Sequence, residues 1–360
     1  MIGSDVADGG GNLASQSPVV PEGDGPSSSS RILVINTRSS HYDDDFQQVL
    51  LQFDELKMPG MPAFHVQNLP RLNMSADQGH RTWTAIAEVI EKEYDNYTGF
   101  VVQHGTDTMV YTATALSFML ENLGKPVMFT GSLIPSNLVQ TDLKRNITLA
   151  MLFAQNKDIC EVCIVFAERL FRGNRTLKSS RHNLQPFASP HFQPLAILKG
   201  NRVMVNDQLL LHAPRGRLRV HTDMSSIILT IKLIPGMEPK MAQRLASATK
   251  AKAIVLCAFG TGNVPSRRGA ILNFTKNCVD RGLLVVVCTQ NRYGSVDLSS
   301  YETGRQLIST GAVGAGDMTV ETTIVKLKYL FGRGLDVPSV RTMLVSNIRG
   351  ETNPSKLSHL

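Results

Sequence analysis

The chain has 360 residues, of which 42% are hydrophobic and 19% are charged, a composition typical of a globular protein with one large or two ordinary cores. No apolar run approaches the roughly 18 residues that are needed to span a bilayer. A net charge of +7 leaves nucleic-acid binding open as a function, but no basic run with interleaved aromatic residues accompanies it. We therefore interpret the charge as a mildly basic surface, and we expect neither a nucleic acid nor a membrane as partner.

The first 30 residues are rich in Gly, Ser and Pro and contain acidic residues but no Lys or Arg. They predict a disordered tail rather than a signal or transit peptide. Five cysteines, most of them in apolar runs, indicate reduced buried thiols and a cytoplasmic location. Cys160 and Cys163 have C-x-x-C spacing, but they enter an apolar strand rather than begin a helix, so we expect core packing in preference to redox chemistry.

The first part of the chain predicts alternating strands and helices. An apolar strand at 32–35 is followed by a polar turn at 36–41, and a short helix is expected at 46–56. A strand at 63–69 leads toward Ser75 and Asp77. A helix follows whose inner face carries four apolar or aromatic residues at helical spacing. These residues are Trp83, Ile86, Ile90 and Tyr94.

The stretch 99–132 predicts one strand–helix–strand unit. Residues 100–102 form an apolar strand, polar residues follow at 104–108, and apolar residues then recur at helical spacing as far as Leu123. Gly124 and Pro126 are expected to stop this helix before the next strand at 127–129. The polar turn lies at the carboxyl end of a strand, which is where open α/β sheets bind ligands.

The remaining chain continues the alternation. Thr141 and Asp142 are expected to cap a helix that runs through Ala154, and a strand at 162–166 precedes a basic loop at 169–180. A hairpin is predicted at 202–211. The second half predicts the strands 227–233, 253–257 and 283–288 and the helices 240–248, 267–281, 321–331 and 337–345.

This pattern predicts two three-layer α/β domains with mainly parallel sheets. We expect an N-terminal catalytic domain at 31–211, a linker at 212–224 that contains Pro214 and Gly216, and a C-terminal domain at 225–360. Neither a dinucleotide-binding nor a P-loop fingerprint is present, and the nine histidines show no metal-ligand spacing.

Thr106 and Asp107 place a hydroxyl beside a carboxylate at a strand's carboxyl end, and Lys178 is the natural charge partner for both. A hydroxyl needs such a base to become a nucleophile. Taken one by one, these residues also fit a helix cap and a solvated basic loop. His41 beside Ser40 likewise fits either a Ser/His pair or a histidine in a surface turn.

Several segments together resemble the type I, cytosolic L-asparaginases. The sequence His-Gly-Thr-Asp-Thr-Met at 104–109 is similar to the second signature of that family. The other similar segments follow in order at near-constant spacing and cover nearly the whole chain from Arg31. They are residues 111–113, 115–123, 130–132, 134–135, 142, 146, 171–176, 178, 187–190, 260, 262–263, 289–290, 301, 303–304, 317–322 and 349–351.

The resemblance implies a homodimeric or homotetrameric enzyme that hydrolyses L-asparagine to L-aspartate and ammonia through an acyl-enzyme, without a metal or organic cofactor. Thr106, Asp107 and Lys178 match the residues of the family that activate attack on the side-chain amide. Four further positions match residues that bind the substrate or line its site. They are Ser75, Asp77, Gly105 and Asn263.

This chain differs from the family in the first signature sequence. The family has Thr-Gly-Gly-Thr-Ile-Gly after the first strand, with its second Thr as the nucleophile, whereas residues 37–42 are Thr-Arg-Ser-Ser-His-Tyr. Alignment puts Ser40 at the nucleophile, but all three glycines are replaced by residues with side chains. The sequence therefore leaves two hypotheses, an L-asparaginase that uses Ser40 and an inactive asparaginase-like protein that binds asparagine or a protein partner.

Overall fold

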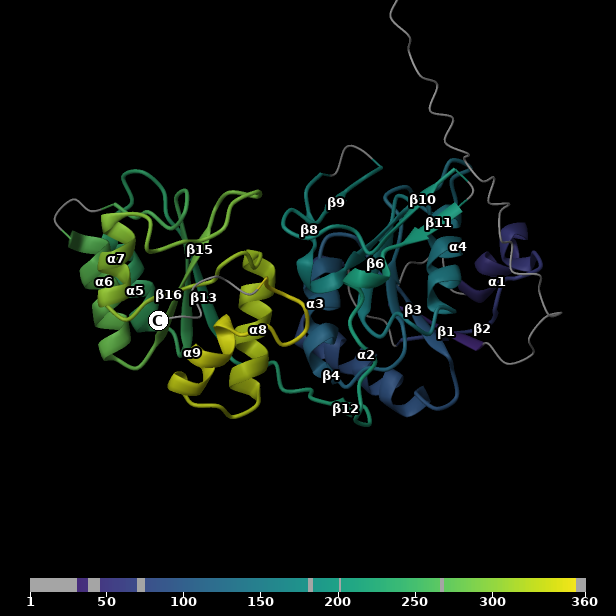
Figure 1. Ribbon diagram of the computed structural model, residues 1–360, viewed down its shortest axis with the longest axis horizontal. Helices are drawn as coiled ribbons and strands as arrows, with labels where there is room; N and C mark the ends of the chain where they lie inside the picture. Colours follow the sequence, from purple (N-terminus) through teal and green to yellow (C-terminus); the bar gives the residue numbers. More distant parts are fainter. Residues whose placement is uncertain are drawn as a thin grey trace, which may run out of the picture.

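The computed structural model describes residues 31–37, 46–69, 75–180, 184–200, 202–265 and 269–353. The chain forms two α/β lobes that lie side by side, the first half of the sequence in one and the second half in the other (Figure 1). This confirms the predicted fold class of two α/β domains with mainly parallel sheets. The predicted tail at 1–30 lies outside the described residues.

The N-terminal lobe is built on an eight-stranded sheet in the order β11-β10-β7-β6-β5-β3-β1-β2. The run from β6 to β2 is parallel, and the three strands from β7 to β11 are antiparallel to their neighbours. Its strands are β1 (Arg31–Asn36), β2 (Ala63–Asn68), β3 (Gly99–Gln103), β5 (Val127–Thr130), β6 (Val162–Phe166), β7 (Arg169–Arg172), β10 (Ala196–Lys199) and β11 (Arg202–Val205).

Helices cover both faces of this sheet. Successive residues of a strand point to opposite faces, so Ile32 and Val34 of β1 enter one core while Leu33 and Ile35 enter the other. The first core contains α1 (Phe46–Leu51) and α4 (Leu143–Ala154), and the second contains α2 (His80–Glu93) and α3 (Met109–Met119). Because both faces are buried, the central strands are continuously apolar rather than alternating.

The C-terminal lobe is built on a four-stranded parallel sheet in the order β13-β14-β15-β16. One core lies between this sheet and the helices α5, α6 and α7, and another lies beneath α8 and α9. The elements are β13 (Ile228–Lys232), α5 (Pro239–Ala248), β14 (Ala253–Ala258), α6 (Ala270–Asp280), β15 (Leu284–Thr289), α7 (Glu302–Ser309), β16 (Val313–Gly314), α8 (Val320–Gly332) and α9 (Val337–Val345).

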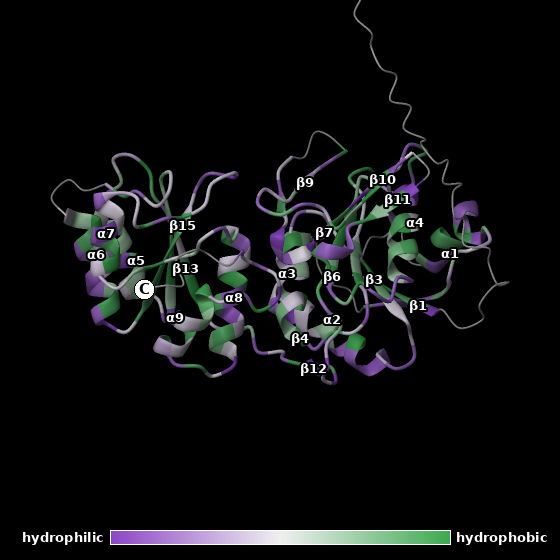
Figure 2. Cartoon of the chain, viewed as in Figure 1, coloured by the Kyte–Doolittle hydropathy of each residue, from purple (hydrophilic) through white to green (hydrophobic). Residues whose placement is uncertain are grey.

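The two lobes share apolar surface through α3 and α8, which face each other where the lobes meet (Figure 1). Phe118 of α3 stacks on Tyr329 of α8, with ring centroids 5.6 Å apart. A two-stranded sheet of β4 (Leu120–Glu121) and β12 (Arg219–Val220) adds a backbone connection below them. Figure 2 shows the apolar residues gathered on the strands and the inner helix faces of both lobes.

The prediction for the helix after β3 was wrong in its length. α3 ends at Met119 rather than near Leu123, because the next two residues leave the helix to pair with β12, about a hundred positions further along the chain. Ten of the eleven residues of α3 are buried, since α8 covers the face that a single-domain helix would expose to water.

The predictions for 169–180 and 202–211 were wrong. Residues 169–172 form the sheet strand β7 rather than a basic loop, and a 3-10 turn at Gly173–Arg175 and a short strand at Leu177–Lys178 follow it. The hairpin lies earlier than predicted, between β10 and β11, and a 3-10 turn at Asp207–Leu209 follows it. The predicted helix at 46–56 is interrupted, with α1 followed by a separate 3-10 turn at Asp54–Lys57.

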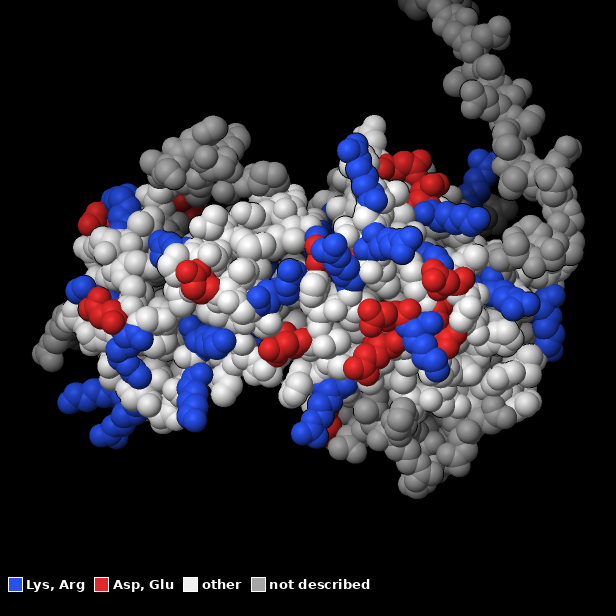
Figure 3. Space-filling view, turned by 90° about the horizontal axis from the view of Figure 1, so that it is seen from below, with Lys and Arg blue, Asp and Glu red and all other residues white. Residues whose placement is uncertain are grey.

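Charged side chains are mixed over the face seen in Figure 3, where Lys and Arg alternate with Asp, Glu and uncharged surface. All five cysteines are free and buried, which confirms the prediction of buried thiols and of core packing at Cys160 and Cys163. Burial raises the pKa of the Cys163 thiol well above its usual range. Among the described residues, no helix is both long and apolar enough to cross a bilayer.

Candidate active site

Three polar segments meet at the carboxyl edge of the N-terminal sheet. Thr37, which follows β1, donates its hydroxyl to the carbonyl oxygen of Gln103 at the end of β3, at 3.0 Å. Gln78 then donates its side-chain amide to the carbonyl oxygen of Thr37 at 3.2 Å. These bonds link the end of β1, the end of β3 and the loop after β2 at one edge of the sheet.

Lys178 contacts both Thr106 and Asp107. Its Nζ lies 2.9 Å from the Thr106 hydroxyl oxygen and 2.6 Å from Oδ1 of Asp107. The Lys178 side chain is 19% exposed whereas that of Asp107 is 69% exposed, so the cluster opens to solvent on the Asp107 side. The hydroxyl, the carboxylate and the amine that the sequence analysis grouped are therefore in direct contact, although 71 residues separate Asp107 from Lys178.

The position of Lys178 depends on the segment that precedes it. Arg175 is 2% exposed and forms an ion pair with Asp317 of the other lobe at 2.7 Å. Lys178 itself belongs to a two-stranded sheet of β8 (Leu177–Lys178) and β9 (Phe187–Ala188). The reading of this stretch as a solvated loop was therefore wrong, because its arginines are buried and paired.

The loop before Thr106 is fixed by a buried histidine. His104 is fully buried, and its Nδ1 lies 2.7 Å from the carbonyl oxygen of Gly105. Burial lowers the pKa of His104 to about 4, and the hydrogen bond to Gly105 offsets this only in part. The ring is thus neutral near pH 7, and its Nδ1–H donates to the Gly105 carbonyl.

The loop after β5 packs tightly beside this segment. An added Cβ on Gly131 would lie 2.2 Å from the His104 carbonyl oxygen, so the two loops leave no room for a side chain there. Asp142 was expected to cap α4, but its carboxylate accepts hydrogen bonds from the backbone N–H groups of Leu133 and Ile134. The Thr141 hydroxyl, which was also expected to cap α4, accepts the bond from the backbone N–H of Leu143 in its first turn.

The other predicted site residues have different positions. Ser40 lies outside the described residues. Ser75 and Asp77 belong to a 3-10 turn at Ser75–Asp77, and Asp77 is exposed. Asn263 lies in the C-terminal lobe, where its side-chain oxygen accepts a hydrogen bond from the Thr303 hydroxyl at 2.9 Å.

A cavity of about 230 Å³ adjoins Lys178 and reaches the C-terminal lobe. Its lining includes Gln290 and Glu321, to which the sequence analysis gave no role. The sequence pattern could have indicated both residues, because Gln290 follows the carboxyl end of strand β15 and Glu321 lies in the first turn of helix α8. Arg292 closes one side of the cavity by donating to the carbonyl oxygen of Ser179 at 2.7 Å.

Two further polar atoms near the Thr106 loop were not predicted. The side-chain oxygens of Gln78 and Gln103 are buried and have no hydrogen-bond partner among the described residues. A buried acceptor without a donor carries a desolvation cost, which a ligand with N–H groups would remove. Among all the residues that the structure describes, no cluster of three or more His, Cys, Asp or Glu side chains could hold a metal ion.

Comparison with known proteins identifies the family. The family model "Asparaginase, N-terminal" matches residues 35–211, and "Glutaminase/Asparaginase C-terminal domain" matches residues 228–344. The chain is 40% identical to L-asparaginase 1 of Escherichia coli strain K12 over 308 residues, which are 86% of this chain and 90% of that protein. It is 35% identical to the L-asparaginase of Thermococcus kodakarensis over 76% of this chain and 81% of that protein.

Solved structures agree with the sequence matches. The L-asparaginase I of Vibrio cholerae superposes with a TM-score of 0.82 at 33% identity, covering 90% of this chain and 99% of that one. The thermostable L-asparaginase of Thermococcus kodakarensis superposes with a TM-score of 0.81 at 30% identity, covering 90% of this chain and 99% of that one. Both lobes are matched in sequence and in structure, and the chain belongs to the asparaginase family.

Proposed function

We propose that this protein is an amidohydrolase that converts L-asparagine and water to L-aspartate and ammonia. The observation that carries the proposal is the contact of Lys178 Nζ with both the Thr106 hydroxyl and the Asp107 carboxylate, in a chain of this family. L-asparaginases at 35% to 40% identity over most of the chain support the same reaction. The reaction uses neither a metal nor an organic cofactor.

The proposed chemistry uses the three residues as a proton relay. In its neutral form the Lys178 amine accepts the Thr106 proton, and the Asp107 carboxylate stabilises the ammonium ion that results. The activated hydroxyl attacks the side-chain amide carbon directly, or it takes a proton from Ser40 so that Ser40 attacks. The acyl-enzyme forms, the protonated nitrogen leaves as ammonia, and water releases aspartate.

Substrate binding is proposed for residues around this relay. Ser75 and Asp77 follow β2, the strand next to β1, Gly105 provides backbone beside Thr106, and Asn263 belongs to the C-terminal lobe. The unpartnered oxygens of Gln78 and Gln103 are additional acceptors for the α-ammonium group of the substrate. This arrangement draws substrate contacts from more than one part of the chain.

The organisation of the whole protein is part of the proposal. We assign residues 31–211 to the catalytic domain, 212–224 to a linker and 225–360 to the C-terminal domain. The family matches at 35–211 and 228–344 support these boundaries. We further propose a cytoplasmic homodimer or homotetramer that acts on a small molecule and not on nucleic acid.

Ammonia release from L-asparagine tests the reaction. We expect activity in the wild-type protein and a loss of about 100- to 10,000-fold in kcat for Thr106→Ala and for Lys178→Met, because each removes a member of the proton relay. Thr148→Ala serves as the matched control, since Thr148 is a hydroxyl residue on α4 whose side chain donates to the carbonyl oxygen of Lys144 in the same helix. Equal release by wild type and Thr106→Ala would instead favour an inactive asparaginase-like binding protein.

The nucleophile is identified by trapping the intermediate. Acid quenching during turnover, followed by peptide mass spectrometry, is expected to show an aspartyl ester on the peptide that contains Ser40 or on the one that contains Thr106. Ester on Ser40 makes Thr106 the activating residue, whereas ester on Thr106 makes it the nucleophile. An active enzyme that carries the ester on neither residue would exclude both assignments.

A further inference from the structure

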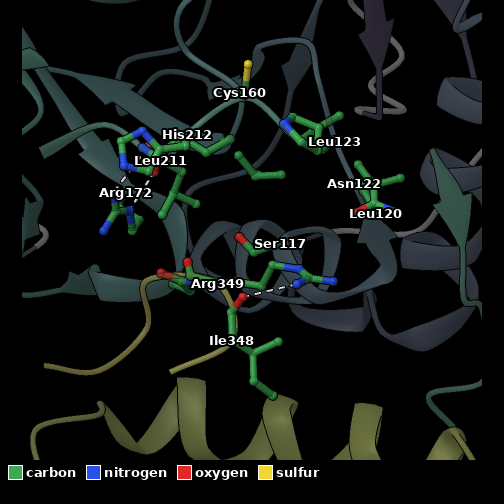
Figure 4. A pocket seen from close by; sticks show the side chains of 14 residues that line it. Ser117, Leu120, Asn122, Leu123, Cys160, Arg172, Leu211, His212, Ile348 and Arg349 are labelled. Carbon is green, nitrogen blue, oxygen red and sulfur yellow. Dashed lines mark hydrogen bonds and ion pairs between the residues drawn. The ribbon is translucent and has the colours of Figure 1, made fainter. Parts of the chain in front are cut away.

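A second cavity lies at the far end of α3 from Thr106. Its volume is about 190 Å³, several times the roughly 30 Å³ that a water molecule occupies in the liquid. Ser117 lines it from α3, Leu120 from β4, Cys160 from the segment before β6, Leu211 from the segment after the 3-10 turn at Asp207–Leu209, and Arg349 from the last described segment (Figure 4). α3 has eleven residues, so about 16 Å of helix separates this cavity from the loop of Thr106.

The cavity wall contains one ion pair, whose two charges balance each other. Arg172 and Glu161 are buried and bonded through two N–H groups, at 2.5 and 3.1 Å. Glu161 also accepts the backbone N–H of Leu211, and Arg172 also donates to the carbonyl oxygen of Leu209. With these bonds made, the pair contributes little net charge to the cavity.

Arg349 is different, because it forms no ion pair with a carboxylate among the described residues; a through-space charge interaction, rather than an ion pair, links it to Glu121. Its Nη1 donates to the carbonyl oxygen of Ile348 at 3.0 Å, as Figure 4 shows, while its Nε is buried and has no partner in the described part of the chain. A guanidinium group that lines a cavity with a free, buried N–H is suited to a carboxylate.

A buried acceptor lies in the same wall. Asn174 is 1% exposed and donates its amide to the carbonyl oxygen of Arg349 at 2.9 Å. Its side-chain oxygen is buried and has no donor among the described residues. The cavity therefore offers one N–H donor of a cation, Nε of Arg349, and one neutral acceptor, Oδ1 of Asn174, that have no partner in the described part of the chain. A ligand that carries an anion and an N–H group would satisfy both.

The segment that presents Arg349 is held rigidly. Glu351 is fully buried and accepts the backbone N–H groups of Ile348 and Arg349, at 3.0 and 2.6 Å. Gly350 has a φ of +75°, and an added Cβ would lie 2.4 Å from Nη1 of Arg172. The turn thus fixes Arg349 before any ligand arrives, which lowers the entropy cost of binding.

We propose that this cavity is a second ligand site, separate from the proposed active site, for a small organic carboxylate that also carries an N–H donor. The carboxylate binds the Arg349 guanidinium, and the N–H group donates to the Asn174 side-chain oxygen. The apolar part of the ligand packs on Leu120 and Leu123. This proposal does not depend on amide hydrolysis, and the two are tested by separate experiments.

Three closely related probes test the ligand chemistry by calorimetry in a buffer free of carboxylate and phosphate. N-acetylglycine carries both the carboxylate and the N–H group, N-acetylsarcosine lacks the N–H group, and N-acetylglycinamide lacks the carboxylate. We expect N-acetylglycine to bind more tightly than either of the other two. Equal binding of all three probes, or binding of none, would overturn the proposal.

Variants then locate the binding. Arg349→Gln is expected to weaken N-acetylglycine binding about 10- to 100-fold, because a charge-assisted hydrogen bond is lost. Arg349→Lys keeps the charge but loses the paired N–H donors of the guanidinium group, so we expect a smaller loss of affinity. This variant replaces Arg349→Gln in the test if Arg349→Gln fails to fold. Arg244→Gln is the matched control, since Arg244 is exposed on α5.

Binding in the Thr106→Ala variant separates this cavity from the proposed active site. We expect Thr106→Ala to bind N-acetylglycine as the wild type does, whether or not asparagine hydrolysis is observed. If Thr106→Ala abolishes binding and both Arg349 variants retain it, the probe occupies the active site and the proposal is wrong.

Discussion

His104 illustrates how one residue beside the proposed site couples its geometry to pH. The ring is fully buried against Phe129, with centroids 5.9 Å apart, and it orders the loop by donating to the Gly105 carbonyl. Its low pKa, about 4, arises from burial of a group that would otherwise titrate near 6.5. A protonated His104 would therefore place an uncompensated charge directly under the Thr106 loop.

The stability of the protein should fall as the pH decreases from 6.5 to 4. In this window the unfolded chain binds a proton at His104 that the folded chain does not, which favours unfolding as the pH falls. The free energy of unfolding should fall by about 3 kcal/mol in total, since each unit of pKa shift corresponds to about 1.4 kcal/mol. Urea unfolding at pH 6.5 and pH 4 should show this drop in the wild type and a smaller one in His104→Gln. Exposed His80→Gln is the control, and an unchanged drop in His104→Gln would contradict the assignment.

At the scale of elements, one buried ion pair joins three segments of the C-terminal lobe. Lys326 of α8 and Glu351 are both fully buried, with Nζ and Oε1 2.5 Å apart. Lys326 also donates to the carbonyl oxygens of Leu344 and Ser346 at the end of α9. Burial lowers the pKa of Lys326, and the charge of Glu351 opposes that change. The pair therefore fixes the end of α9 and the turn that presents Arg349.

Removing one partner of this pair should destabilise the protein strongly. Lys326→Met leaves the Glu351 carboxylate buried without a cation, and we expect the free energy of unfolding to fall by about 3–5 kcal/mol. The double variant Lys326→Met/Glu351→Gln should lose less than the sum of the two single changes, because no charge remains buried. Lys276→Met on α6 removes an exposed pair and should cost less than about 1 kcal/mol. Additive losses in urea unfolding would show that the pair is not coupled.

At the scale of the whole molecule, the lobes are joined by polar contacts as well as by the apolar surface of α3 and α8. Arg175 of the N-terminal lobe donates to both carboxylate oxygens of Asp317, at 3.1 and 2.7 Å, and to the carbonyl oxygen of Glu351 at 2.7 Å. Burial alone would raise the pKa of Asp317, but hydrogen bonds from Arg175 and Thr352 outweigh it and hold that pKa below its usual value. Because Lys178 lies three residues after Arg175, this contact also positions the proposed site.

Breaking the contact between the lobes should reduce both stability and activity. We expect Arg175→Met to cost about 3–5 kcal/mol, since Asp317 is then left without its cation. Asp317→Asn should be less stable than the wild type at neutral pH. The folded-state pKa of Asp317 is lowered, so its contribution is complete above 3.8 and is lost as the pH falls through that value toward the folded-state pKa. Unfolding of wild type and Asp317→Asn should therefore converge in acid, and a constant difference down to low pH would contradict this.

Much of the fold could be predicted from local sequence pattern, and each element that was missed has a physical reason. The strands β3, β6 and β14 were found because apolar runs bounded by turn residues specify them within a few positions. The helix α7 and the short strand β16 were missed, because the buried residues of α7 are few and β16 has only two residues. β7 was taken for a loop because its arginine, Arg172, finds its counter-charge only in the folded structure.

The sequence by itself determined the alternation of strand and helix, the placement of Thr106 and Asp107 at a strand's carboxyl end, and the pairing of that cluster with Lys178 as a hypothesis. These follow from hydrophobic periodicity and from motifs, which are local properties of the chain. Only the tertiary structure decided that α3 is buried on all sides, that Arg172 and Arg175 are paired, and that Arg349 lines a second cavity. Each of these depends on contacts between residues far apart in sequence, whose distances no local pattern encodes.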